Sequence, residues 1–94
     1  MTHPAPHPRF KVEIKPSALK SLSKLPAKHR MQIREAIDGL AVNPRPPGLK
    51  KMVGEITLHR IYSGVYRIVY DIFDATVSVH VVRIGHRKDV YRNL

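Results

Sequence analysis

The 94-residue sequence contains no cysteine. The chain therefore forms neither a disulfide nor a thiolate metal site, and a reducing compartment is compatible with it. It also lacks any apolar run near the roughly 18 residues that a membrane span requires, and its N-terminus has no apolar signal-peptide core. These absences predict a cytoplasmic protein with no membrane partner.

Carboxylates are scarce as well. Seven Asp and Glu residues stand against 17 Lys and Arg residues, which gives a formal net charge of +10. The acids are spread along the chain: Glu13, Glu35, Asp38, Glu55, Asp71, Asp74 and Asp89. Because metal-dependent nucleases need clustered carboxylates, and no histidine pair has ligand spacing on a helix, we expect no metal and no cofactor. The basic excess indicates nucleic acid, a ribosome or an acidic protein as the partner.

The length and a hydrophobic content of 43% predict one globular domain with a modest core. Residues 1–8 are rich in Pro and His and predict a flexible tail, so the domain is expected to cover residues 9–94. The sequence contains no internal repeat and no Gly-rich phosphate loop.

The first half of the domain predicts one strand and two helices. Residues 9–15 alternate between apolar and charged side chains, which is typical of a strand. A helix then begins at Pro16 and Ser17, and Pro26 ends it and serves in the first turn of a second helix. The apolar positions expected to be buried are Ala18, Leu19, Leu22 and Leu25 in the first helix and Ile33, Ala36, Ile37, Leu40 and Ala41 in the second.

The second half predicts a loop and three strands. Residues 42–48 contain three prolines and a glycine, which favour a loop. A strand around residues 56–62 follows, and two more β-rich runs lie between residues 62 and 92. The order β-α-α-β-β-β predicts an α+β domain, in which two N-terminal helices pack on one face of a small antiparallel-type sheet.

Two tight turns set the expected register of the last three strands. A two-residue loop at Ser63 and Gly64 places Arg60 opposite Arg67. A second turn at Asp74-Ala75 is expected to give the pairs Ile72 with Val77, Tyr70 with Val79, and Arg67 with Val82.

Alternation then divides the sheet into a core face and a half-wet face. The core face is expected to carry Ile61, Tyr66, Ile68, Tyr70, Ile72, Val77, Val79 and Val81. The half-wet face is expected to carry Arg60, Tyr62, Arg67, Asp71, Ser78 and His80, with Leu58, Val69 and Val82 between them.

Like charges directly opposite one another, as Arg60 and Arg67 are in this register, destabilise a sheet by roughly 0.2–1 kcal/mol. Both guanidinium groups can splay into water, or one can pair with Asp71. The segment 83–92 adds further cations and a histidine against Asp89 alone, which favours a polyanion as the ligand of this face. Its members are Arg83, His86, Arg87, Lys88 and Arg92.

Arg, Lys, His and Tyr side chains can cleave RNA without a metal, because RNA supplies its own nucleophile in the 2′-hydroxyl. The protein must align that oxygen with the phosphorus, stabilise charge on the phosphoryl oxygens and move two protons. Guanidinium groups suit the second task because they carry forked donors and a permanent charge. Tyr or His can move protons, although an unperturbed Tyr titrates near ~10 and needs neighbouring cations to act as a base.

Three stretches resemble one protein family. They are GHRKDVYR (residues 85–92), YSGVYRIVYDI (residues 62–72) and LKKMVGE (residues 49–55). Together with the β-α-α-β-β-β order they resemble the RelE/ParE superfamily of toxins from type II toxin–antitoxin systems, and the GHR-x-DVYR ending resembles its RelE branch. The resemblance implies a RelE-like fold and a metal-independent endoribonuclease, which enters the ribosomal A site, cuts mRNA and so inhibits translation.

The resemblance also implies catalytic residues. Arg67 matches the transition-state arginine of the family, and Arg87 matches its second catalytic arginine. Tyr91 matches the tyrosine that stacks on or deprotonates the substrate. Leu58 stands where the family's lysine general base is expected. Candidates to replace that lysine are His59, His80 and His86, of which His86 lies beside Arg87 but is equally compatible with a solvated turn histidine.

A second group of residues is expected to bind RNA rather than to react. This group comprises Arg60, Lys50, Lys51, His86, Lys88 and Arg83. Tyr62, on the basic face, is a candidate for base stacking.

As partners, the resemblance implies an acidic RelB-like antitoxin that covers or distorts the basic face, together with the ribosome and mRNA. Two alternatives stay open. One is a ParE-like toxin that inhibits gyrase and has no nuclease activity, a reading against which the pair Arg87 and Tyr91 argues. The other is a non-toxic basic domain that binds RNA with a steep salt dependence and does not cleave it.

Overall fold

The structure, a computed structural model, describes residues 9–46, 50–52 and 55–90, with the backbone alone for 50–52 and 55–57. The expected tail of residues 1–8 lies outside the described residues. The elements follow the order β1 (Lys11–Ile14), α1 (Pro16–Ser23), α2 (Ala27–Val42), β2 (Lys50–Met52), β3 (Glu55–Ser63), β4 (Tyr66–Phe73), a 3₁₀ turn η1 (Asp74–Thr76) and β5 (Ser78–His86).

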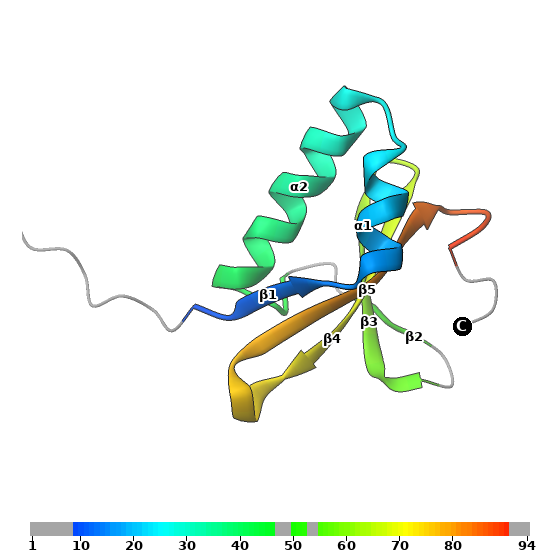
Figure 1. Cartoon of the computed structure of the whole chain (residues 1–94). Coiled ribbons are helices and arrows are strands. Elements are labelled where there is room, and N and C mark those ends of the chain that lie inside the picture. The colour runs from blue at the N-terminus through cyan, green and yellow to red at the C-terminus, as the bar shows by residue number, and fades with distance from the viewer. Residues whose placement is uncertain (1–8, 47–49, 53–54, 91–94) are drawn as a thin grey trace, which may run out of the picture.

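The strands form one sheet of five, in the order β1-β5-β4-β3-β2, and both helices lie on the same side of it (Figure 1). All neighbouring strands are antiparallel except β1 and β5, which are parallel. The predicted α+β class, with two N-terminal helices on one sheet face, is therefore confirmed. The parallel edge and the three-residue strand β2 are additions that the sequence pattern did not predict.

Prolines mark the start of both helices. Pro16 is the first residue of α1, where its missing N–H costs no hydrogen bond, and Pro26 precedes α2 as its N-cap residue. The buried positions recur every three or four residues: Ala18 and Leu22 in α1, and Ile33, Ile37 and Leu40 in α2. Leu19 was expected in this stripe but is 46% exposed, because it lies about 100° around the helix from Ala18.

The core lies between the helices and one sheet face. Its sheet side is formed by Ile68, Tyr70, Val79, Val81 and Ile84, with Ile61, Tyr66 and Ile72 partly buried against it. The expected core face is thus confirmed except for Val77. That residue has a left-handed backbone (φ 49) after the 3₁₀ turn and is 37% exposed, so it belongs to the turn rather than to the core.

The register of the first hairpin differs from the predicted one. Ser63 pairs with Tyr66, so the two-residue loop is Gly64-Val65 and not Ser63-Gly64. Gly64 has φ +60 at the first loop position, the place where a type II′ turn requires glycine. As a result Arg67 lies opposite Tyr62 and not opposite Arg60, which pairs with Val69.

The second hairpin is shifted too, because the 3₁₀ turn is longer than the expected tight turn at Asp74-Ala75. The observed pairs are Ile72 with Val79, Tyr70 with Val81 and Arg67 with Gly85. The register also slips between Val69 and Tyr70, which pair with Arg83 and Val81 and leave Val82 as the extra residue of a bulge. This bulge turns Arg83 away from the helices and places Ile84 in the core, 3% exposed.

The sheet face away from the helices is called the outer face here. Its members, by register, are Leu58, Arg60, Tyr62, Arg67, Val69, Asp71, Phe73, Ser78, His80 and Arg83. Every residue predicted for the half-wet face is among them except Val82, which is the bulge residue.

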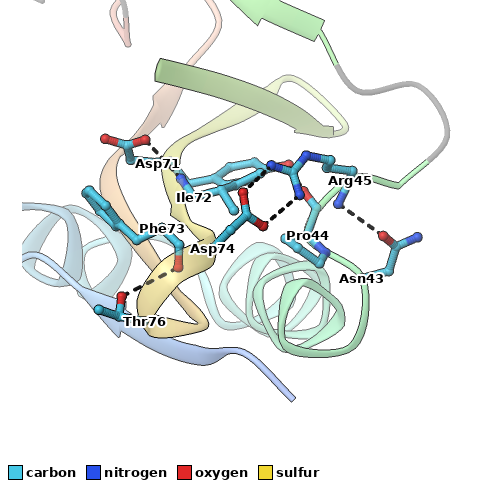
Figure 2. A network of polar contacts seen from close by, with 9 residues as sticks. Asn43, Pro44, Arg45, Asp71, Ile72, Phe73, Asp74 and Thr76 are labelled. Carbon is cyan, nitrogen blue, oxygen red and sulfur yellow. Dashed lines mark hydrogen bonds and ion pairs between the residues drawn. The ribbon is translucent and has the colours of Figure 1, made fainter. Parts of the chain in front are cut away.

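A polar network fastens the loop after α2 to the turn between β4 and β5 (Figure 2). Arg45 binds the Asp74 carboxylate through two hydrogen bonds of 3.1 and 2.9 Å, and the Tyr70 hydroxyl donates to the carbonyl oxygen of Pro44 at 2.7 Å. The hydrogen bond from Arg45 lowers the pKa of Asp74. Burial raises the pKa of Tyr70 to about 12, which favours the neutral hydroxyl that donates to Pro44.

Neither helix in the described part of the chain is long and apolar enough to cross a membrane.

Candidate functional site

The turn at Gly64-Val65 brings two of the predicted catalytic residues to the same end of the sheet. Nη1 of Arg67 donates hydrogen bonds to the carbonyl oxygens of Gly64 (2.9 Å) and Tyr66 (3.0 Å). The backbone N–H of Arg87 donates to the carbonyl oxygen of Val65 (2.7 Å). The β3–β4 turn therefore binds both the guanidinium group of Arg67 and the backbone of Arg87. Arg87 directly follows β5, whose end lies beside this turn (Figure 1).

An aromatic ring lies under the Arg67 guanidinium group. The Cζ atom of Arg67 is 3.9 Å from the ring centroid of Tyr62, its cross-strand partner. The Cζ atom of Arg60 is 6.0 Å from the same centroid. Arg60 and Arg67 are therefore diagonal neighbours, and both guanidinium groups lie near the Tyr62 ring. The prediction that these two arginines lie directly opposite each other was wrong.

Arg87 is the first residue of the turn 87–90 that follows β5. Val90 is 2% exposed, and its Cβ lies about 3.5 Å from the position that a Cβ would take on Gly85. Because Gly85 is the cross-strand partner of Arg67, this contact holds the turn beside the Arg67 strand. Arg87 and Lys88 are exposed on the turn.

His86 has a structural role in the same turn. Its Nδ1 accepts a hydrogen bond from the N–H of Lys88 (3.1 Å), and its carbonyl oxygen accepts from the N–H groups of Asp89 and Val90. By register it pairs with Tyr66 on the helix-facing side, where the two rings meet edge to face with centroids 6.2 Å apart. His86 is thus a neighbour of Arg87 in sequence but lies on the opposite sheet face from Arg67.

The other two candidates for the missing lysine, His59 and His80, lie away from the turn. His59 is 7% exposed and stacks on Tyr70 on the helix-facing side, as expected. His80 is on the outer face, but it pairs with Glu13 at 2.9 Å and lies opposite Asp71, toward the β4–β5 turn. Leu58, at the position of the missing lysine, also faces Asp71.

The remaining predicted residues fall into two groups. Arg83 is on the outer face opposite Val69. The backbone of Lys50 pairs with Arg60 and that of Lys51 with His59, while their side chains lie outside the described residues, as do Tyr91 and Arg92. Among the described residues, no group of three or more His, Asp or Glu side chains is placed to hold a metal ion.

Sequence reasoning missed the contact between Tyr62 and Arg67 and the role of the Gly64 carbonyl. Both depend on the loop being Gly64-Val65. Gly64 indicated that a turn lies here, but glycine suits either position of a two-residue loop and does not choose between them.

One protein-family model matches most of the chain. The family model of the ParE toxin of type II toxin–antitoxin systems (parDE) matches residues 12–91. No match was found among curated proteins.

Several solved structures share the fold. The toxin–antitoxin complex RelBE2 of Mycobacterium tuberculosis has a chain that is 28% identical, with a TM-score of 0.74 over 86% of this chain and 94% of that one. The RelBE complex of E. coli contains a chain that is 26% identical, with a TM-score of 0.72 over 82% of this chain and 95% of that one. The RelE–RelB complex of Pyrococcus horikoshii OT3 has a chain with a TM-score of 0.76, 24% identity, and coverage of 87% of this chain and 99% of that one.

Proposed function

Because the chain belongs to the ParE toxin family of type II toxin–antitoxin systems, within the RelE/ParE superfamily, we propose that it is a RelE-like endoribonuclease. Its proposed substrate is mRNA in the ribosomal A site, and its proposed effect is to stop translation in the cytoplasm. The observation that carries the proposal is that Arg67 and Arg87 both donate hydrogen bonds to the β3–β4 turn, at one end of a basic sheet face.

The proposed reaction uses the RNA's own nucleophile. The 2′-oxygen attacks the adjacent phosphorus, the bond to the 5′-oxygen of the next nucleotide breaks, and the products carry a 2′,3′-cyclic phosphate and a 5′-hydroxyl. One proton leaves the 2′-hydroxyl and one is delivered to the 5′-oxygen. Negative charge grows on the phosphoryl oxygens in between, and fixed cations are the groups that stabilise it.

Arg67 and Arg87 are proposed to bind those oxygens. Both Nη1 contacts of Arg67 are to backbone carbonyls, which leaves the N–H donors of Nε and Nη2 without an acceptor in the part of the chain that the structure describes. The N–H of Nε and one N–H of Nη2 match the two non-bridging oxygens of a phosphodiester. Tyr91 is proposed as the proton carrier, because it matches the tyrosine of the family pattern and because His86 lies on the opposite sheet face from Arg67.

The proposed partner that restrains the toxin is an acidic RelB-like antitoxin. Support comes from the RelB chains present in the similar complexes and from the net charge of +10. An amphipathic helix and an extended segment that cover the outer face would block access to Arg67.

The alternative function is gyrase inhibition, which the ParE description of the matching family model favours. The two functions differ in the molecule that is damaged. We propose to induce the protein in cells, map mRNA ends by primer extension, and measure plasmid supercoiling by purified gyrase in parallel. Cuts within codons and unchanged supercoiling are the expected result, whereas intact mRNA with inhibited gyrase would replace the nuclease proposal.

Two controls sharpen this experiment. A single 2′-deoxy nucleotide at the mapped cleavage position should abolish the cut, because it removes the nucleophile. Arg34→Ala removes an exposed guanidinium group from α2, on the opposite side of the sheet from the outer face (Figure 1), and should leave cleavage unchanged, whereas Arg67→Ala should lower the cleavage rate by about 10²–10³.

A further inference from the structure

We infer that Tyr62 is a positioning residue for Arg67: its ring fixes the guanidinium group in the orientation that receives the scissile phosphate. The inference rests on the proposed ribonuclease function and assigns a role that the family resemblance did not include. It is drawn from the contacts of the β3–β4 hairpin.

Three contacts hold the Arg67 guanidinium group, and all come from the same hairpin. The Tyr62 ring lies 3.9 Å from Cζ, and the Gly64 and Tyr66 carbonyls take the N–H donors of Nη1. An arginine side chain is long and has many rotamers, and fixing one of them on binding costs conformational entropy. Because these three contacts already fix the Arg67 guanidinium group, most of that entropy is lost before a phosphate binds. The hairpin thus prepares Arg67 before the substrate arrives.

An aromatic ring has a specific part in this arrangement. A guanidinium group is attracted to the negative face of a ring, and this attraction is electrostatic rather than merely apolar. Phenylalanine at position 62 would keep the ring face, and leucine would keep much of the apolar volume without it. The Tyr62 side chain is 50% exposed, so neither substitution disturbs the core.

Tyr62 was also a candidate for stacking on an RNA base. The ring face toward Arg67 is already in van der Waals contact with the guanidinium group, which leaves no room there for a base. The two roles predict different kinetics. Loss of a stacking residue weakens RNA binding, whereas loss of a positioning residue lowers the rate at saturation.

The test is a double-mutant cycle on single-turnover cleavage of ribosome-bound mRNA at saturating protein. A cation–π contact of this kind is lost in Tyr62→Leu, and the rate constant should fall about 5- to 30-fold with little change in the concentration for half-maximal rate. Tyr62→Phe should restore the rate to within about twofold of the wild type. In the Arg67→Ala background, Tyr62→Leu should cause no further loss, because the group that it positions is gone.

Phe73→Leu is the matched control. Phe73 is an aromatic residue on the same sheet face and is 41% exposed. It lies toward the other end of β4, where its ring centroid is 4.7 Å from that of His80. This variant should cleave at the wild-type rate. Equal losses in Phe73→Leu and Tyr62→Leu, or a full loss from Tyr62→Leu in the Arg67→Ala background, would overturn the inference.

A spectroscopic readout separates this inference from the proposed function. In the wild type, the Arg67 side-chain Nε–H signal should show an upfield ring-current shift, which Tyr62→Phe keeps and Tyr62→Leu loses. If the wild type does not cleave ribosome-bound mRNA, the proposed function and this inference both fail. If it cleaves but the shift is absent or the cycle is additive, this inference alone fails.

Discussion

Replacing Tyr70 with phenylalanine removes one oxygen atom from the core. The side chain is fully buried, and its hydroxyl donates a 2.7 Å hydrogen bond to the carbonyl oxygen of Pro44, which is buried too. The substitution takes the hydroxyl partner from that buried acceptor, a loss that costs about 1–3 kcal/mol. We expect the free energy of unfolding, measured by urea denaturation at pH 7, to fall by that amount.

The same variant should change the response of stability to alkali. Burial raises the pKa of Tyr70 from 10 to about 12 in the folded protein. Because the folded-state pKa is the higher one, the stabilisation from the neutral hydroxyl is complete below pH ~10 and is lost as the pH rises toward about 12. The stability difference between the wild type and Tyr70→Phe should therefore narrow over this range.

Tyr66→Phe is the control for this pair of measurements. Tyr66 is half-buried on the same sheet face, and its hydroxyl has no hydrogen-bond partner in the described part of the chain. Its removal should change the free energy of unfolding by less than about 0.5 kcal/mol. A Tyr70→Phe variant as stable as Tyr66→Phe at pH 7 would contradict these expectations, as would a stability deficit that stays constant up to pH ~12.

Three further outcomes follow from the described contacts. Gly64→Ala places a side chain on a backbone with φ +60 and should lower the free energy of unfolding by about 1–2 kcal/mol, measured by thermal denaturation. An unchanged melting temperature would contradict the turn type. Asp74→Asn should destabilise the protein at pH 7, and this deficit should shrink as the pH falls below ~3.9, because the Arg45 hydrogen bond lowers the pKa of Asp74 and its stabilisation is lost as acid protonates the carboxylate; a deficit that stays constant as the pH falls would argue against the ion pair. His86→Ala removes the acceptor of the Lys88 N–H and should speed hydrogen exchange of amides 88–90 about fivefold, while unchanged protection would deny His86 its role in the turn.

The sequence predicted which residues share a sheet face, although both hairpin registers were wrong. In a hairpin, moving the loop by one residue changes the sum of paired residue numbers by two, and alternation has a period of two. Arg60, Tyr62 and Arg67 therefore stay on one face in either register. Face membership follows from alternation, which is robust, whereas the choice of partner depends on turn type, which is not.

The turn types needed information that alternation does not carry. Glycine at position 64 suits either the first or the second position of a two-residue loop, and the strands flanking it are compatible with both. The bulge at Val82 was also not predicted from the sequence. Only the break in apolar alternation at Val82, Arg83 and Ile84 indicated an extra residue there. That break decides the place of Arg83, because strict alternation from Val79 and Val81 would have buried it.

The parallel pairing of β1 with β5 connects the two ends of the described chain and left no local trace in the sequence. The stack of Arg67 on Tyr62 likewise follows from the register and not from any motif. The catalytic candidates were found from a family pattern, whereas the contacts that hold them became visible only in three dimensions.

Joint action of Arg67 and Arg87 is tested by single-turnover cleavage of mRNA on stalled ribosomes, with the wild type, Arg67→Ala, Arg87→Ala and the double variant. If both guanidinium groups stabilise one transition state, each single substitution should lower the rate at saturating protein by about 10²–10³, and the double variant should lose less than the product of the two. Wild-type rates in either single variant, or losses that higher protein concentration restores, would contradict the claim that Arg67 and Arg87 act together on one phosphate.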